Sequence, residues 1–124
     1  MDVKININVA AMTYSVDHIN AKPNDAVRIT LTNNGDVLHN VVLIRPGSID
    51  TVGAQVEAMA KVPNAEERSY LPPTPDILFW MKLVELGQTG TLEFYAPAQP
   101  GDYPFLCTYP GHWQTMRGIL HVAP

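Results

Sequence analysis

The sequence has little cysteine, little charge and no long apolar run. Its 124 residues include one cysteine, so no disulfide can form within the chain and cysteine pairing does not indicate the redox compartment. Only 16% of the residues are charged, 12 acidic and 8 basic. The chain therefore lacks the excess of basic residues that is typical of a nucleic-acid-binding protein. No stretch of about 18 apolar residues is present, so no membrane-spanning helix is predicted.

Short strands dominate the predicted secondary structure. The 11 prolines favour strands, turns and loops over long helices. Apolar and polar residues alternate in 3–9 and 27–32, which is the period of a half-buried strand. Further strand-like segments cover 37–44, 77–84, 89–95, 103–107 and 118–122, and helical spacing covers 50–61. These seven or eight strands predict one all-β domain over residues 1–124, an antiparallel sandwich or barrel with one helical insertion.

One segment carries the candidate chemistry. Cys107, His112 and Met116 place a thiolate, an imidazole and a thioether within ten residues, in a loop between two predicted strands. A Pro-Gly pair between the first two forces the chain to turn, so their side chains can converge. His39, on an upstream strand, offers a second imidazole. Two histidines and one cysteine with a weak axial methionine suit copper electron transfer, because this mixed ligand set serves both oxidation states.

Other interpretations of the same residues remain open. Cys107 and Met116 could be apolar packing residues. A structural zinc site could use the cysteine and both histidines, although such sites usually add a fourth cysteine or histidine. A cysteine nucleophile would need a substrate cleft and an oxyanion pocket, for which the sequence has no signature. The main alternative is a copper chaperone or storage module that uses the same ligands.

The run CTYPGHWQTM, residues 107–116, is similar to the copper loop of the azurin and auracyanin cupredoxins. The upstream run His39-Asn40-Val-Val-Leu resembles the His-Asn-x-Val-Leu strand of the same family. The resemblance implies a Greek-key β-sandwich or barrel of about eight strands that binds one type 1 copper ion. In that reading His39, Cys107 and His112 are the equatorial ligands and Met116 is the axial ligand.

The resemblance also implies roles for residues around the ligands. The carbonyl of Leu38 would face the copper, although the azurin pattern has glycine at this position. The side chain of Asn40 would bond across to Thr108, and the backbone N–H groups of Asn40 and Tyr109 would point at the cysteine sulfur. Trp113 follows a ligand that reaches an apolar surface in this family, so we expect it in a docking face for redox partners. The structural disulfide of azurin is absent.

The function implied by the resemblance is electron transfer without bond chemistry. The chain would be an electron carrier and not an enzyme, although it could be a domain of a larger redox enzyme. Expected partners are redox proteins such as a cytochrome or an oxidoreductase domain, and the carrier is expected to be a monomer. The resemblance implies a periplasmic or other extracytoplasmic protein. Because residues 1–4 have no apolar secretory stretch, we expect a segment cut from a longer precursor or multidomain parent.

Overall fold

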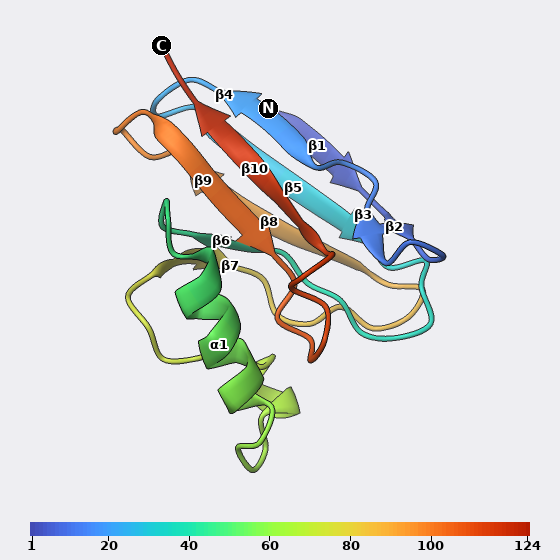
Figure 1. The fold of residues 1–124 in the computed structure, drawn as a ribbon. Helices are drawn as coiled ribbons and strands as arrows, with labels where there is room; N and C mark the ends of the chain where they lie inside the picture. The colour runs from blue at the N-terminus through green and yellow to red at the C-terminus, as the bar shows by residue number, and fades with distance from the viewer.

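The alternating apolar residues form the facing sides of two β-sheets, which pack as the layers of a sandwich (Figure 1). The structure is a computed structural model that describes all residues, Met1–Pro124. One sheet has the order β1-β5-β8, the other has the order β4-β10-β9-β6-β7, and β2 pairs with β3 in a small ribbon. In chain order the strands are β1 (Asp2–Ile5), β2 (Ile7–Asn8), β3 (Thr13–Tyr14), β4 (His18–Ala21), β5 (Ala26–Thr32), β6 (Val42–Ile44), β7 (Ile77–Trp80), β8 (Thr89–Tyr95), β9 (Gly101–Leu106) and β10 (Arg117–Val122). The predicted β-sandwich is confirmed.

The two sheets are mixed, so the predicted antiparallel pairing holds for most pairs of strands but not for all. β1 runs parallel to β5, and β4 runs parallel to β10, whereas the remaining pairs are antiparallel. After β1 the chain crosses to the other sheet. It returns in β5, which lies beside β1 and runs in the same direction. Alternation with a period of two shows that one face of a strand is buried. The period is the same in parallel and antiparallel pairs, so the sequence pattern could not reveal the direction of pairing.

Strand lengths also differ from the predicted ones. The segment 37–44 forms regular pairing only in β6, and 77–84 only in β7, while His39 and Val84 make a single bridge between the remaining parts. β3 and β4 were not predicted because each contributes at most two apolar residues. In β4 only Ile19 and Ala21 face inward.

The core has two parts that meet at strand β6. Leu43 belongs to the large cluster between the sheets, while Val42 and Ile44 belong to a smaller cluster on the other face. That smaller cluster is covered by α1 (Ile49–Met59), which contributes Val52 and Val56. β6 is therefore buried on both faces, which is why its sequence is continuously apolar.

Helix α1 and the connection between β9 and β10 lie at the same end of the sandwich, and the two chain termini lie toward the other end (Figure 1). The helix falls where helical spacing predicted it, within two residues at each end. A short 3-10 helix, η1 (Glu66–Arg68), follows in the connection to β7. Neither helix has the length and apolarity needed to cross a bilayer.

Candidate metal centre

Three of the predicted ligands converge at one buried point. His39 precedes β6, Cys107 directly follows β9, and His112 lies in the β9–β10 connection. The candidate donor atoms of the three residues all lie within 4.8 Å of one another. The sulfur of Cys107 is 3.6 Å from Nδ1 of His112, and the two imidazole rings stack with their centroids 4.9 Å apart. Two strands and one loop thus bring together residues that are 68 positions apart in sequence.

The ring of His39 is the clearest sign that this point holds a ligand. The residue is fully buried, and neither of its ring nitrogens has a hydrogen-bond partner within the protein. Buried polar atoms without partners are rare in native proteins, because each loses its hydration without compensation. A metal ion that accepts a nitrogen lone pair would supply the missing partner, so the residues fit a bound metal.

Burial also sets the protonation of the three donors. It lowers the pKa of His39 from 6.5 to about 4, with the neighbouring His112 adding to the effect. Burial likewise lowers the pKa of His112, and it raises the pKa of Cys107 from 9.0 to about 11. Near neutral pH the site without metal therefore holds two neutral imidazoles, ready to bind, and a thiol that must release its proton to a metal.

Backbone N–H groups stabilise the negative charge that the sulfur would carry. Those of Asn40 and Tyr109 bond to Cys107 and act to lower its pKa, against the larger effect of burial. The ring of Tyr109 also packs against the ring of His112 in a tilted arrangement, with the ring centroids 4.8 Å apart. Each of these contacts comes from a residue next to a ligand or inside the ligand loop.

Two polar side chains join the strand of His39 to the loop of Cys107. The amide of Asn40 donates to Oγ1 of Thr108 at 2.8 Å, and the backbone N–H of Thr108 donates to Oδ1 of Asn40 at 2.9 Å. The hydroxyl of Thr108 in turn donates to the carbonyl of Ser69 at 2.7 Å. All these groups are buried, so the network fixes the two ligand segments relative to each other.

Met116, the predicted axial ligand, closes the loop. It is fully buried, and its backbone N–H donates to the carbonyl of His112 at 2.8 Å. Its carbonyl accepts a bond from the N–H of Cys107 at 3.2 Å. The loop is thus tied at both ends by its own backbone.

Leu38 is half-buried immediately before His39.

Trp113 packs against helix α1 with its ring partly buried, next to the smaller core cluster. Its indole N–H donates to the carboxylate of Glu57 at 3.0 Å. The structure therefore gives this tryptophan a packing role. Its expected role in partner docking stays a prediction.

Several residues near the site had no signal in the sequence. Gly35 and Asp36 lie between two predicted strands, yet Gly35 lies against His39, and Asp36 acts to raise the pKa of both ligand histidines. Tyr14 lies on an unpredicted strand, and its hydroxyl donates to the carbonyl of Asn40 at 2.5 Å. Ser69 lies in an irregular connection. A local pattern could not place any of them, because each reaches the site through tertiary packing.

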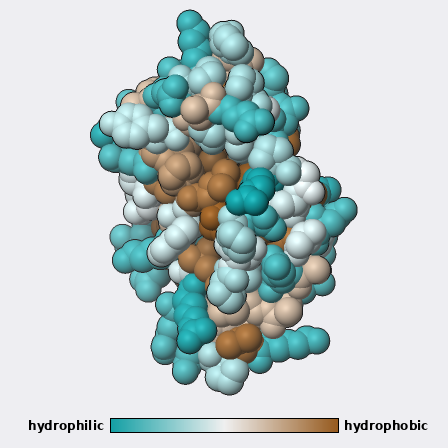
Figure 2. All heavy atoms as spheres, turned by 90° about the vertical axis from the view of Figure 1, so that its left-hand side faces the viewer, coloured by the Kyte–Doolittle hydropathy of each residue, from teal (hydrophilic) through white to brown (hydrophobic).

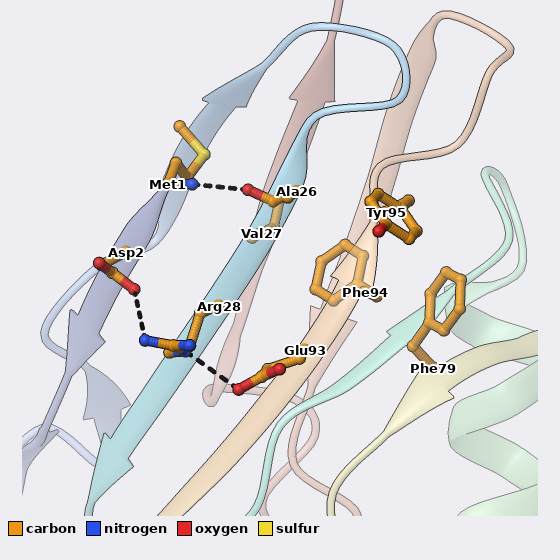
Figure 3. A pocket seen from close by; sticks show the side chains of 9 residues that line it. All are labelled: Met1, Asp2, Ala26, Val27, Arg28, Phe79, Glu93, Phe94 and Tyr95. Atoms are coloured by element: carbon orange, nitrogen blue, oxygen red, sulfur yellow. Dashed lines mark hydrogen bonds and ion pairs between the residues drawn. The ribbon is translucent and has the colours of Figure 1, made fainter.

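A hollow on the surface of β5 and β8 is separate from this site (Figure 3). None of the four predicted ligands lines it. Its charged groups are already paired, since Arg28 bridges Asp2 and Glu93, and the N-terminal amine donates to the carbonyl of Ala26 (Figure 3). Figure 2 shows a further surface feature, a cluster of apolar side chains ringed by polar ones on the face at the left of Figure 1. The residues that line the hollow offer no set of metal ligands.

Comparison with known proteins identifies the family. Residues 1–123 match the sequence model of the copper-binding proteins of the plastocyanin/azurin family. The chain therefore belongs to this family. The family and the donor set together indicate one type 1 copper ion as the cofactor.

Several of the similar proteins are auracyanins. Auracyanin-B of Chloroflexus aurantiacus is 33% identical over 98% of this chain, and auracyanin-A of the same organism is 27% identical over 97%. The chain spans about half the length of auracyanin-B (52%) and 73% of auracyanin-A. Among solved structures, auracyanin A, a blue copper protein of C. aurantiacus, superposes with a TM-score of 0.84 at 26% identity, covering 99% of this chain and 98% of that one. The dithionite-reduced auracyanin of Roseiflexus castenholzii gives 0.82 at 27% identity, covering 99% and 97%.

Proposed function

We propose that the chain is a blue-copper electron-transfer protein or domain in which His39, Cys107, His112 and Met116 bind one copper ion. The observation that carries the proposal is the fully buried ring of His39, whose two unpartnered nitrogens lie in one cluster with a thiol and a second imidazole. When bound, copper supplies a one-electron Cu(II)/Cu(I) couple. Such a couple needs a ligand frame that changes little between the two states.

The protein supplies that frame. Cys107 directly follows β9, and His39 lies shortly before β6, the neighbouring strand of the same sheet. The hydrogen bonds between Asn40 and Thr108 hold these two segments together. The backbone N–H groups of Asn40 and Tyr109 stabilise the thiolate and so tune the site. Leu38 would present its carbonyl to the copper from the opposite side.

The electron would pass through His112. This residue has 8% of its surface exposed, whereas His39, Cys107 and Met116 are fully buried. Among the four ligands it alone reaches solvent, so its ring edge is the shortest route for outer-sphere transfer. Weak docking around this edge suits a carrier that must bind and release its partners quickly.

The wider proposals follow from electron transfer and family membership. The chain would act as a carrier and not as an enzyme, either free or as a domain of a larger redox enzyme. Residues 1–124 would form one cupredoxin domain and work as a monomer in the periplasm or another extracytoplasmic space. Redox proteins such as a cytochrome or an oxidoreductase domain would be its partners. The similarity to auracyanins supports these proposals.

The decisive experiment is to add Cu(II) to the purified copper-free protein and record its visible spectrum and electrochemistry. We expect an intense copper–thiolate absorption and a reversible one-electron wave, both lost in Cys107→Ser. A copper complex without that absorption would overturn the electron-transfer proposal. Copper that binds but passes readily to a chelator or acceptor protein, without reversible redox cycling, would favour a chaperone or storage module.

A further inference from the structure

Helix α1 makes an unusually close contact with the ligand loop. Gly53 lies in the middle of the helix and is buried beneath the ring of Trp113, the residue after the ligand His112. A Cβ at position 53 would lie 2.6 Å from three carbon atoms of that ring. Glycine is a poor helix former, so its place in a helix interior calls for such a packing reason. No other residue would let the ring lie this close to the helix backbone.

A second contact holds the same part of the loop. One carboxylate oxygen of Glu57, Oε1, accepts a bond from the indole N–H of Trp113 at 3.0 Å and another from the side-chain amide of Gln114, also at 3.0 Å. Glu57 lies four residues after Gly53, which places both on one face of the helix. The helix therefore holds two successive loop residues that lie between the ligands His112 and Met116.

The helix also touches the chain on the other side of the loop. Val52 and Val56 pack in one buried cluster with Leu106, the residue directly before the ligand Cys107. Trp113 packs against the same cluster. Helix α1 thus contacts the residue that precedes the first loop ligand and the residue that follows the second.

We infer that Gly53 and Glu57 are positioning residues, which fix the ligand loop by holding Trp113 and Gln114 against helix α1. These contacts do not involve the donor atoms of the ligands, and only their consequence for redox properties rests on the proposed function. The inserted helix limits how far His112 can move when the copper changes oxidation state. It also covers one side of the loop against water.

The first test is made on the copper-free protein by amide hydrogen exchange across residues 108–116. Gly53→Ala should displace the Trp113 ring and speed exchange in this segment by about fivefold or more. In the Trp113→Ala background, the same glycine replacement should have little further effect, since no ring remains to clash. Equal effects of Gly53→Ala in both backgrounds would show that the helix, and not the ring contact, is responsible, and would overturn the inference.

The second test isolates Glu57. Glu57→Ala removes both hydrogen bonds, while Glu57→Gln keeps an acceptor oxygen and removes the charge. Asp50→Ala is the matched control, because Asp50 is exposed in the first turn of the same helix and its side chain bonds to nothing. We expect faster exchange in the loop for Glu57→Ala, a smaller change for Glu57→Gln and none for Asp50→Ala. Unchanged exchange in Glu57→Ala would contradict its positioning role even if Gly53→Ala fails to fold.

Copper-loaded protein gives a readout that stability alone would not move. Glu57→Ala should alter the copper–thiolate band and the reduction potential and should release copper to a chelator about fivefold faster, whereas Asp50→Ala should match wild type. A protein that binds no copper would refute the proposed function but leave the exchange results intact. If Glu57→Ala speeds amide exchange as expected but leaves the copper–thiolate band and the reduction potential unaltered, the helix has only a structural role and the positioning inference is overturned.

Discussion

Gly35 lies so close to His39 that a Cβ at position 35 would stand 2.9 Å from the Nε2 atom of the imidazole. The glycine belongs to the turn after β5, and its neighbour Asn33 fixes it by accepting its backbone N–H at 3.0 Å. Because His39 is fully buried, its ring is enclosed by protein and cannot turn out into solvent. The turn therefore sets where this ligand ring lies.

We expect Gly35→Ala to weaken copper binding. The added methyl group would push the ring of His39 out of line with the other donors, and overpacking of this kind typically costs about 1–3 kcal/mol. Copper affinity should fall about tenfold or more, measured by competition with a chelator of known affinity. Gly101→Ala is the control, since the nearest atom to its new Cβ would be 3.6 Å away. Equal affinities for wild type and Gly35→Ala would show that the turn does not position the ligand.

The bonds between Asn40 and Thr108 predict a loss of stability. Asn40→Ala removes both bonds and leaves the buried N–H of Thr108 without a partner, which should lower the free energy of unfolding by about 2–3 kcal/mol. Denaturant unfolding of the copper-free protein measures this directly. Asn20→Ala, which removes one exposed bond to His18, should change stability by less than about 0.5 kcal/mol. Similar losses in the two variants would rule out a special role for the buried pair.

The sequence predicted that Cys107 and His112 converge, and the structure brings their donor atoms together. Cys107, His112 and Met116 lie within ten residues of each other, and a Pro-Gly turn between two strands is enough to bring two of them together. His39 was placed by resemblance, because its approach depends on how two distant strands pack. Gly35 and Glu57 had no signal at all, since each acts through a contact with a residue far away in the chain. The parallel pairs β1–β5 and β4–β10 were missed because apolar alternation has the same period in parallel and antiparallel strands.

The copper-free protein should lose stability at both ends of the pH scale. His39 has a pKa of about 4 when folded and 6.5 in its ordinary state, so between these values the unfolded chain binds the extra proton. Stability therefore falls as the pH drops from 6.5 toward 4, by about 3 kcal/mol for this group. Cys107 has a pKa of about 11 when folded against 9.0, so the unfolded chain loses its proton first and stability falls as the pH rises from 9 toward 11.

Denaturant unfolding of the copper-free protein across pH 4 to 11 checks this profile. His39→Gln should reduce the loss of stability on the acid side and Cys107→Ala the loss on the alkaline side, whatever the variants do to stability at neutral pH. A profile that stays level below pH 6.5 in the wild type would mean that His39 is not held neutral by burial. His112, whose pKa is also lowered by burial, adds to the acid loss in the same direction.

Trp113 is expected to take part in the docking of redox partners. Its ring is only partly buried and follows the one ligand that reaches solvent, so a face for electron exchange would include it. If so, Trp113→Ala should slow electron transfer to a protein partner about tenfold, the range expected when an interface aromatic is truncated. The same variant also loosens the loop, which would slow transfer to every acceptor. Stopped-flow rates should therefore be compared for a cytochrome and for a small inorganic oxidant. A loss confined to the cytochrome supports docking, an equal loss with both oxidants assigns the effect to the loop, and unchanged rates with the cytochrome exclude Trp113 from the docking face.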